Sequence, residues 1–342
     1  MESQIEHEAA SVLTTPAASH LHDAAHPHII PLRSQVAVVI LTRNALRHWA
    51  PLSTGIRLQG LPPAQVIVVD SNSTDETREL TAAEGYQVVP AEARQLNPAA
   101  LRRLALEFVP WAAVVVYLAQ DAILATSDSL DRLVAAFEDP GVAAAFGRQL
   151  PRLGARPIEA HASLYRFPGQ SRLSGLEDGG APGVQPQLPY GSFSAYRVDA
   201  LLKAGGFPSN VITGEDAIVA ARLLLAGWKT AYAADALVHH SHRYSLTQEL
   251  GRSFDEAVCL EREPWLARLF PTPAGEHKRF LRSALSYLSA RSPQLFIASL
   301  LRALARTIGA QLGSRQTKHG RGFPALFSYN KDFWRCYKAP RS

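Results

Sequence analysis

Two acidic sites in this sequence have the setting that catalysis or metal binding requires. Asp121 lies near the end of the apolar stretch 113–123, which is too short to span a membrane and is typical of a buried central strand. Ligands of open α/β sheets bind just beyond the carboxyl ends of the strands, so Asp121 is a candidate for holding a metal ion or a phosphate group. Glu215 and Asp216 begin a helix directly after Gly214, and a carboxylate there could accept a proton from a hydroxyl group.

Other polar residues directly follow predicted strands and are expected at the same edge of the sheet. The segment 42–44 follows the strand 35–41, and the segment 70–75 begins where the strand 65–70 ends. An aspartate after the second strand of a nucleotide-binding half can accept hydrogen bonds from a base or a ribose, which makes Asp70 a candidate. The alternative is that Asp70 is a turn residue that flanks the next helix.

Three histidines, His239, His240 and His242, lie in a predicted strand later in the chain. Asp121, one of these histidines and the oxygens of a diphosphate would form the octahedral, oxygen-rich site that suits Mg²⁺ or Mn²⁺. A cation there would neutralise charge on a departing nucleoside diphosphate. Each feature also has an ordinary structural explanation: an aspartate that caps a turn, histidines packed at an apolar edge, and acids placed at a helix start by the helix dipole.

Strands and helices alternate through the first half of the chain. Strands are predicted at 35–41, 65–70, 86–90, 113–123 and 142–147, with helices between them that end near residues 59, 85, 108 and 138. This alternation predicts a parallel, doubly wound sheet with right-handed crossovers. Ser73 and Glu76 have the spacing of a capping box for the second of these helices.

The second half begins with an irregular stretch and ends in helices. Residues 149–189 are rich in Gly, Pro and Arg and are predicted to form loops over the site, with a mobile lid as one interpretation. Strands are then predicted at 191–196, 228–232 and 236–242, and helices at 198–204 and 215–226. We therefore expect a disordered leader at 1–33, an α/β domain at 34–245 and a basic helical region at 246–342.

Lysine and arginine concentrate at the C-terminal end. The segment 278–342 has 13 Lys and Arg against one acid, Asp332, a net charge of +12, whereas the segment 1–277 carries −7. This asymmetry indicates a polyanionic partner, either an anionic membrane surface or a nucleic acid. Apolar residues recur at helical spacing among arginines in 280–288 and 294–312. This pattern predicts either helices packed on the rest of the protein or interfacial helices that bind a membrane.

The two cysteines, Cys259 and Cys336, provide neither a disulfide framework nor a zinc site, which favours a reducing cytosolic setting. The first thirty residues lack the apolar core of a secretory signal. No later stretch has eighteen apolar residues free of charge, so the sequence predicts no transmembrane helix.

Four ordered segments, 36–44, 66–77, 117–122 and 214–216, together resemble the family 2 inverting glycosyltransferases of GT-A fold. The resemblance implies the fold class: α/β, with a Rossmann-like, mostly parallel central sheet flanked by helices and a C-terminal helical extension. It also implies which residues bind the nucleotide, namely Thr42, Arg43, Asn44, Asp70, Asn72, Gln120 and Asp121.

The nearer resemblance is to bacterial dTDP-rhamnose-dependent rhamnosyltransferases, which carry Gln-Asp-Ala where most relatives have Asp-x-Asp. The segments 240–245 and 252–255 are also similar to that group. The resemblance implies that Asp121 and His240 or His242 hold Mg²⁺ or Mn²⁺, and that Asp216 is the base, supported by Glu215. The implied reaction is inverting transfer of a sugar, rhamnose from dTDP-rhamnose, to a hydroxyl of a glycan or lipid-linked acceptor in cell-surface polysaccharide synthesis.

Two departures from the family pattern leave alternatives open. Gln120 replaces the first acid of Asp-x-Asp, which would weaken metal binding or remove the need for a metal. The segment 96–102 follows the family's donor-loop pattern only loosely, so the donor sugar stays open. The alternatives are a nucleotidyltransferase, although the glycine-rich phosphate loop usual there is absent after the first strand, and a non-catalytic sugar-nucleotide or polyanion-binding protein. We expect no nucleic-acid partner and a cytoplasmic protein, peripheral on the inner face of the cell membrane; the oligomeric state is unknown.

Overall fold

The computed structural model describes residues 33–91, 97–177, 191–271, 275–319 and 324–336. The predicted leader therefore lies, apart from Arg33, outside the described residues. The chain divides into two compact units: the first comprises 1–149, 168–208 and 215–240, and the second comprises 150–167, 209–214 and 241–342. The predicted domain boundaries after residues 33 and 245 stay predictions.

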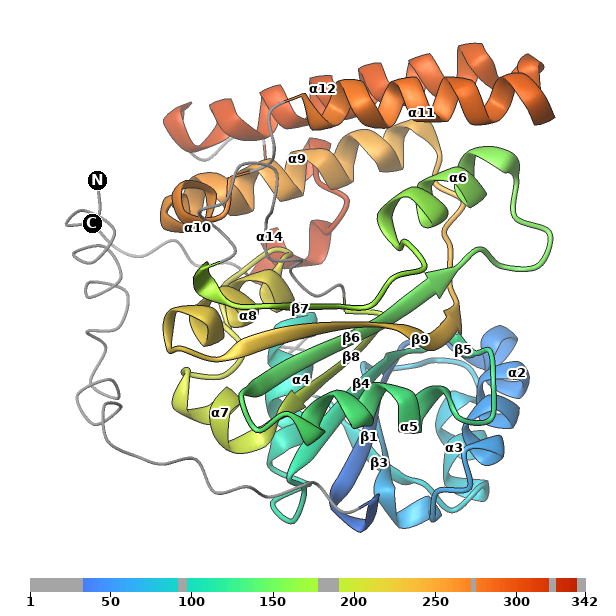
Figure 1. The fold of residues 1–342 in the computed structure, drawn as a ribbon, viewed down its shortest axis with the longest axis vertical. Coiled ribbons are helices and arrows are strands. Elements are labelled where there is room, and N and C mark those ends of the chain that lie inside the picture. Colours follow the sequence, from blue (N-terminus) through green and yellow to red (C-terminus); the bar gives the residue numbers. More distant parts are fainter. Residues whose placement is uncertain (1–32, 92–96, 178–190, 272–274, 320–323, 337–342) are drawn as a thin grey trace. The chain divides into compact units, whose positions relative to one another are not determined.

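A mixed sheet forms the centre of the first unit (Figure 1). Its strands are β1 (Val36–Thr42), β2 (Val66–Asp70), β3 (Gln87–Pro90), β4 (Val114–Ala119), β5 (Ile123–Leu124), β6 (Val142–Leu150), β7 (Arg172–Ser174), β8 (Phe193–Arg197) and β9 (Lys229–His239). Within the described residues the order is β3-β2-β1-β4-β8-β6-β9-β5, and β7 also pairs with β9. The predicted parallel pairing is confirmed for β3-β2-β1-β4, whereas β4 and β6 pair with β8 in antiparallel orientation.

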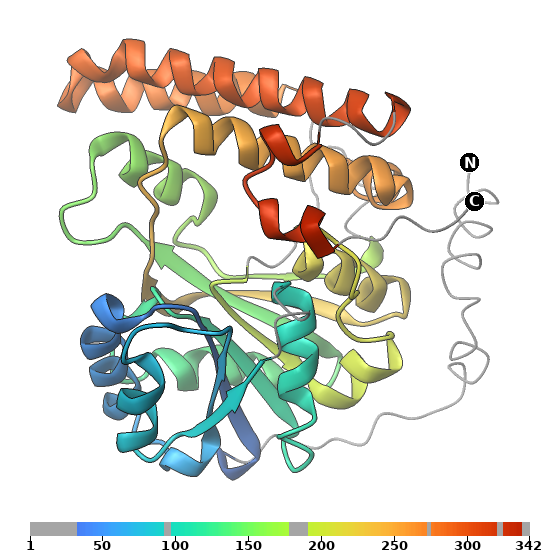
Figure 2. The same ribbon diagram turned by 180° about the vertical axis from the view of Figure 1, so that it is seen from behind.

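The parallel strands are nearly continuous runs of valine and isoleucine because helices cover both of their faces. Every residue of β2 is buried. Opposite views show α4 (Pro98–Leu106) on one face of the sheet and α5 (Ser129–Val134) on the other (Figures 1 and 2). The unit's other helices are α2 (Leu46–Leu58), α3 (Thr77–Ala83), α7 (Val198–Lys203) and α8 (Glu215–Leu225).

Three local predictions are wrong. The two strands predicted at 228–232 and 236–242 are one strand, β9, because β7 and β5 pair with its two halves and carry it through alanine residues with little strand preference. The stretch predicted to be loops contains β7 and the helix α6 (Pro157–Arg166), whose start is fixed by the amide of Arg156 donating to Glu159. The third error is the capping box, since α3 begins at Thr77 without a side-chain cap.

The second unit is helical, as predicted for the chain after residue 246. It contains α6, α9 (Leu246–Arg262), α10 (Pro264–Leu269), α11 (Glu276–Arg291), α12 (Phe296–His319), α13 (Pro324–Phe327) and α14 (Lys331–Cys336). Ser245 and Gln248 form a reciprocal capping box at the start of α9. Both views show α11 and α12 side by side in this unit (Figures 1 and 2).

Asp255 on α9 accepts a hydrogen bond from a segment of the second unit that is distant in the sequence. It is buried, and its Oδ2 accepts the amide hydrogen of Asn330 at 2.9 Å. Asn330 in turn donates its side-chain amide to the carbonyl of Ile212 at 3.0 Å. Burial raises the pKa of Asp255 to about 6, against the opposing effect of the hydrogen bonds it accepts.

This raised pKa predicts a specific dependence of stability on pH. An acid that is harder to ionise in the folded state stabilises that state below its unfolded pKa, and this contribution is lost as the pH rises through the folded value. We expect the free energy of unfolding of the wild type to fall by on the order of 3 kcal/mol, relative to Asp255→Asn, between about pH 4 and about pH 6. Denaturant unfolding at a series of pH values measures the difference. Glu261→Gln, an exposed acid on the same helix, is the control and should track the wild type. Parallel curves for wild type and Asp255→Asn would contradict the prediction.

Candidate active site

The polar segments that follow β2, β1 and β4 meet at one edge of the sheet. These three strands are parallel neighbours, with Thr42 opposite Asp70 and Leu41 opposite Ala119. Since the carboxyl ends of parallel strands share an edge, the residues after them must lie close together. The predicted convergence of Thr42, Asp70 and Gln120 is therefore confirmed.

Asp70 is the buried hydrogen-bond acceptor that holds the loops at this edge. It is fully buried and accepts hydrogen bonds from the hydroxyl of Thr42 (3.1 Å), the amide (2.9 Å) and hydroxyl of Ser73, and Nε of Arg78. Burial opposes ionisation of Asp70, but these hydrogen bonds outweigh it and the pKa is lowered. The four donors come from the chain itself, so the carboxylate anchors the turn after β2. A direct contact between Asp70 and a nucleotide stays a prediction.

Gln120 links the ends of β4 and β1 in a way that an acid could not. Its Oε1 accepts the amide hydrogen of Arg43 at 2.7 Å, and its Nε2 donates to the carbonyl of the same residue at 3.2 Å. An ionised carboxylate accepts but cannot donate. Glutamine at this position therefore holds the β1 end in place and directs the next residue, Asp121, beyond the strand.

Asn44 and Asn72 shape the two loops that face each other across this edge. Both have left-handed backbone conformations, with φ of 51° and 57°, which asparagine tolerates better than most residues. The amide of Asn44 donates to Ser73 Oγ, and its Oδ1 accepts the amide hydrogen of Thr74, each at 2.8 Å. The side chains of Arg43, Asn44 and Asn72 remain exposed, as a ligand-contacting rim requires.

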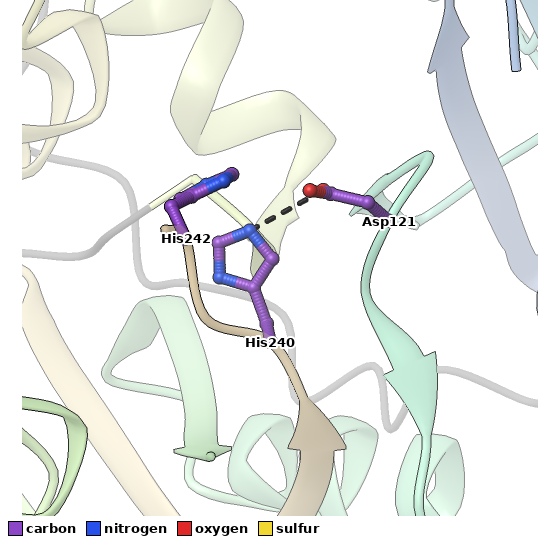
Figure 3. Close-up of side chains that lie close together, drawn as sticks. All are labelled: Asp121, His240 and His242. Atoms are coloured by element: carbon purple, nitrogen blue, oxygen red, sulfur yellow. Dashed lines mark ion pairs between the residues drawn. The ribbon is translucent and has the colours of Figure 1, made fainter. Parts of the chain in front are cut away.

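Asp121 and His240 face each other at the ends of β4 and β9. Oδ1 of Asp121 lies 3.3 Å from Nε2 of His240 (Figure 3). His242 follows two residues later in the chain, and one ligand atom from each of the three side chains lies within 4.8 Å of the other two. Their neighbour His239 is not a member of this cluster. A carboxylate and two imidazoles are a ligand set that Mg²⁺ and, better, Mn²⁺ accept.

The other ring nitrogen of His240 fixes its tautomer. Nδ1 lies 2.9 Å from Oε1 of Gln149, an atom that can only accept, so Nδ1 carries the proton. Nε2 then offers its lone pair toward Asp121. Two acceptors at 3.3 Å repel unless a second proton or a cation lies between them. A metal-binding histidine is typically oriented by such a partner on its other nitrogen, so the residues present fit a divalent cation.

The second acidic site lies at the start of α8. Asp216 is buried, and its Oδ1 accepts hydrogen bonds from Nη1 of Arg102 and from the hydroxyl of Tyr196, the latter at 2.7 Å. Arg102 comes from α4 and Tyr196 from β8, so three elements converge on one oxygen. Nη2 of Arg102 also donates to the carbonyl of Gly191 at 2.9 Å. The other oxygen, Oδ2, is directed toward Gly191.

Arg102 is the cation beside two buried carboxyl groups, those of Asp216 and Glu215. Its guanidinium also lies 3.8 Å from Glu215 and stacks over the rings of Tyr117 and Phe207, 5.2 and 5.4 Å from their centroids. Burial raises the pKa of Glu215, and Arg102 opposes that shift. Burial would lower the pKa of Arg102, but the two carboxylates outweigh it and the pKa is raised. Arg102 therefore stays charged and keeps this acidic pair from being an uncompensated buried charge.

Two consecutive residues, Gly191 and Ser192, lie beside the two acidic sites, one beside each. A side chain at Gly191 would collide with both Arg102 and Oδ2 of Asp216, so a larger residue there would displace these side chains. The next residue, Ser192, has its hydroxyl 3.5 Å from Nε2 of His240. Neighbouring Cα atoms are about 3.8 Å apart, so the predicted base Asp216 and the predicted metal ligand His240 lie in one region of the first unit.

Sequence reasoning missed Arg102, Tyr196 and Gln149. The first had a recognisable signal, because Arg102 lies three residues from Ala99 and three from Ala105 on the buried face of α4. A charge within an apolar helix face indicates a buried partner, but nothing in the pattern identifies Asp216 as that partner. Tyr196 and Gln149 have no distinguishing pattern in the sequence, and only their contacts with Asp216 and His240 in the structure identify them.

Comparison with known proteins gives a consistent result. The model of the glycosyl transferase family group 2 matches residues 114–254. An O-antigen chain rhamnosyltransferase of Salmonella typhimurium, RfbN, is 34% identical, with 88% of this chain and 96% of the relative covered. The corresponding enzyme WbaN of Salmonella anatum is 33% identical over 87% and 95%.

The solved structure of the mannosyltransferase PcManGT from Pyrobaculum calidifontis, in complex with GDP-Man and Mn²⁺, superposes with a TM-score of 0.53 at 20% identity, covering 92% of this chain and 93% of that one. This likeness concerns the fold alone, and it confirms the predicted fold class. Together with the relatives above 30% identity, it shows that this chain belongs to the family 2 glycosyltransferases and has their GT-A fold.

Proposed function

We propose that this glycosyltransferase transfers rhamnose from dTDP-rhamnose, with inversion, to a hydroxyl of a glycan or lipid-linked acceptor in cell-surface polysaccharide synthesis. The observation that carries the donor sugar is the similarity, over almost their whole lengths, to two O-antigen chain rhamnosyltransferases. The Gln120–Asp121 pair at the end of β4 agrees with it, because the glutamine replaces an acid that other members of the family use.

The nucleotide is proposed to bind at the carboxyl edge of β2, β1 and β4. Thr42 and Asp70 fix the two loops there, while Arg43, Asn44 and Asn72 are exposed on their rim. Exposed backbone and side-chain donors in tight left-handed loops suit a phosphate or a ribose. Gln120 contributes by holding the Arg43 backbone in position.

Asp121, His240 and His242 are proposed to hold Mg²⁺ or Mn²⁺. When bound, the ion would stabilise negative charge on the diphosphate leaving group. The residues themselves prepare the site: Gln149 fixes the tautomer of His240, and the β4 end directs Asp121 toward Nε2. The close approach of two acceptors in this arrangement favours a cation between them.

Asp216 is proposed as the base. Oδ1 is held by Arg102 and Tyr196, which leaves Oδ2 to accept a proton. The acceptor hydroxyl oxygen forms a bond to the anomeric carbon as its proton passes to Oδ2, and the bond to the diphosphate oxygen breaks with its electrons leaving on the diphosphate. Attack opposite the leaving group inverts the configuration in one displacement. Glu215 takes part through Arg102, which it contacts at 3.8 Å.

We also propose that the enzyme works in the cytoplasm at the inner face of the membrane. Nucleotide-sugar donors are soluble, whereas a lipid-linked acceptor is confined to a membrane surface. A peripheral enzyme meets both substrates, and the basic C-terminal segment suits an anionic surface.

The donor and the base can be tested together. Among nucleotide sugars, dTDP-rhamnose should raise the thermal midpoint of the protein most and should be consumed in the presence of a lipid-linked glycan extract. Asp216→Asn should retain this thermal shift while transfer falls by about 10²- to 10⁴-fold, because the proton acceptor is lost. Asp199→Asn, an exposed acid on α7, is the control and should transfer normally. Near-normal transfer by Asp216→Asn would refute the base, and stabilisation by a different nucleotide sugar alone would refute the donor.

The metal proposal has a test that does not depend on turnover. Calorimetric titration with Mn²⁺, alone and with dTDP, should show that Asp121→Ala weakens both binding events by more than the roughly 10- to 100-fold typical of losing an outer-shell partner. His239→Ala is the matched control, since His239 is adjacent to His240 on the chain but outside the cluster. Unchanged affinity in Asp121→Ala would rule out its function as a ligand.

Arg102 is expected to act as a positioning residue for Asp216. In Arg102→Met the two carboxyl groups lose their cation, so the acidic limb of the pH–rate profile should move to higher pH. The kcat should fall on the order of 10²-fold with little change in KM for the donor. Arg102→Lys keeps the charge but not the planar fork, so it should restore the pH profile more than kcat.

A buried arginine elsewhere in the first unit separates this effect from general destabilisation. Arg197 is buried on β8 and donates to the carbonyls of Val142 and Phe137. Arg197→Met should lower the thermal midpoint without moving the pH profile. If both methionine variants shift the profile equally, Arg102 has no specific effect on the base.

A further inference from the structure

The helix α12 packs with small residues and an arginine inward. Its buried residues are Ser299, Arg302, Ala305, Gly309 and Gly313. Its exposed large residues, which we call the α12 ridge, are Ile297, Leu300, Leu301, Leu304 and Ile308. In the ridge, Ile297 is 71% exposed and Leu304 is 55% exposed. A surface helix of a soluble protein normally shows the opposite arrangement.

Contacts within the second unit fix this orientation. Arg302 donates to Oε1 of Glu249 at 2.7 Å and to the carbonyl of Tyr244 at 2.6 Å. Arg306 lies 3.6 Å from the other oxygen of Glu249. These bonds join α12 to α9 through charged groups that are mostly buried. Turning the ridge inward would break them and leave Glu249 without its cations.

Glycines on the same side bring the two helices into close contact. A Cβ at Gly309 would overlap the carbonyl of Leu250, and one at Gly313 would overlap the carbonyl of Phe254. Small residues four apart are the usual means of close helix packing. The buried side of α12 is therefore specific to α9, and the ridge is left outward.

Exposed cations lie on α11, which packs beside α12, and on α12 itself. Exposed basic residues on the neighbouring α11 are Lys278, Arg279, Arg282 and Arg291, and Arg315 is exposed on α12. The only acid in α11 is Glu276, which Arg279 neutralises at 2.8 Å, and α12 has none. An exposed apolar strip together with exposed cations on the same helix pair is the composition of helices that lie in the interface of an anionic bilayer.

We propose that the α12 ridge inserts into the head-group region of an anionic lipid bilayer, with the cations of α11 and Arg315 contacting lipid phosphates. The inference depends on α12 and not on the sugar, the metal or the base. Self-association through the ridge is disfavoured, because a two-fold contact would bring these like charges together.

The same observations oppose a membrane-spanning helix. Among the described residues, Pro293–Gln316 has the length and composition to cross a membrane, and 17% of its most apolar window is buried. Crossing would place Arg302 and Arg306 in hydrocarbon and separate them from Glu249. The absence of a transmembrane helix therefore stays a prediction. In an interfacial position, the buried side of α12 would keep its contacts with α9 while the ridge contacts lipid.

Vesicle flotation of the full chain tests the proposal. Vesicles of phosphatidylcholine with about one third phosphatidylglycerol should carry the wild type upward, and pure phosphatidylcholine should carry much less. The triple variant Ile297→Gln, Leu300→Gln, Leu304→Gln should bind the anionic vesicles at least tenfold less. Leu58→Gln with Leu202→Gln, exposed leucines of α2 and α7, is the control and should float as the wild type does. Arg282→Gln with Arg291→Gln should lose about fivefold per arginine, and added salt should have the same effect.

The ridge is exposed, so the triple variant should keep the wild-type thermal midpoint, which shows that it is folded. Equal flotation of the folded triple variant and the wild type would overturn the proposal. It would also be overturned if light scattering showed a wild-type dimer that the triple variant abolishes, because the ridge would then bind a second copy. Resistance of the bound wild type to alkaline carbonate would indicate a spanning helix and would likewise overturn it.

Discussion

The buried contact between Arg102 and Asp216 is the interaction on which the proposed chemistry depends. Two consecutive acids at the start of a helix are favoured by the helix dipole, but two buried carboxylates repel each other. A single guanidinium from α4 offsets that repulsion and is itself enclosed by Tyr117, Phe207 and the carbonyl of Gly191. The ion pair costs desolvation, and good hydrogen bonds are what make such a pair tolerable.

The contacts with Arg102 and Tyr196 make the two oxygens of Asp216 different, because both donors bind Oδ1. Oδ2 is therefore the oxygen left for the proposed proton transfer. The geometry fixes the orientation of the carboxylate, as expected when much of the barrier is lowered by correct placement of the reactants.

Much of the first unit could be predicted because its signals are local. The runs of Val and Ile in β1, β2 and β4 identify buried parallel strands, and adjacency of parallel strands brings Thr42, Asp70 and Gln120 to one edge. The continuity of β9 could not be predicted, since pairing with β5 and β7 overrides the weak strand preference of its alanines. Arg102 and Tyr196 could not be predicted for a similar reason: their importance lies in contacts with Asp216, which is 114 positions from Arg102 and 20 from Tyr196.

The helix α12 shows how a pattern can be recognised and still leave its direction open. Apolar residues at helical spacing predict an amphipathic helix, and the ordinary inference is that the apolar side packs inward. Here Gly309 and Gly313 exclude bulky side chains from the α9 contact, and Glu249 requires cations on that side. Both constraints fill the inner side with small and basic residues, so the large apolar ones remain outside. Exposed leucines and isoleucines are unfavourable in water, and a lipid surface that covers them removes that cost while the nearby arginines contact its phosphates.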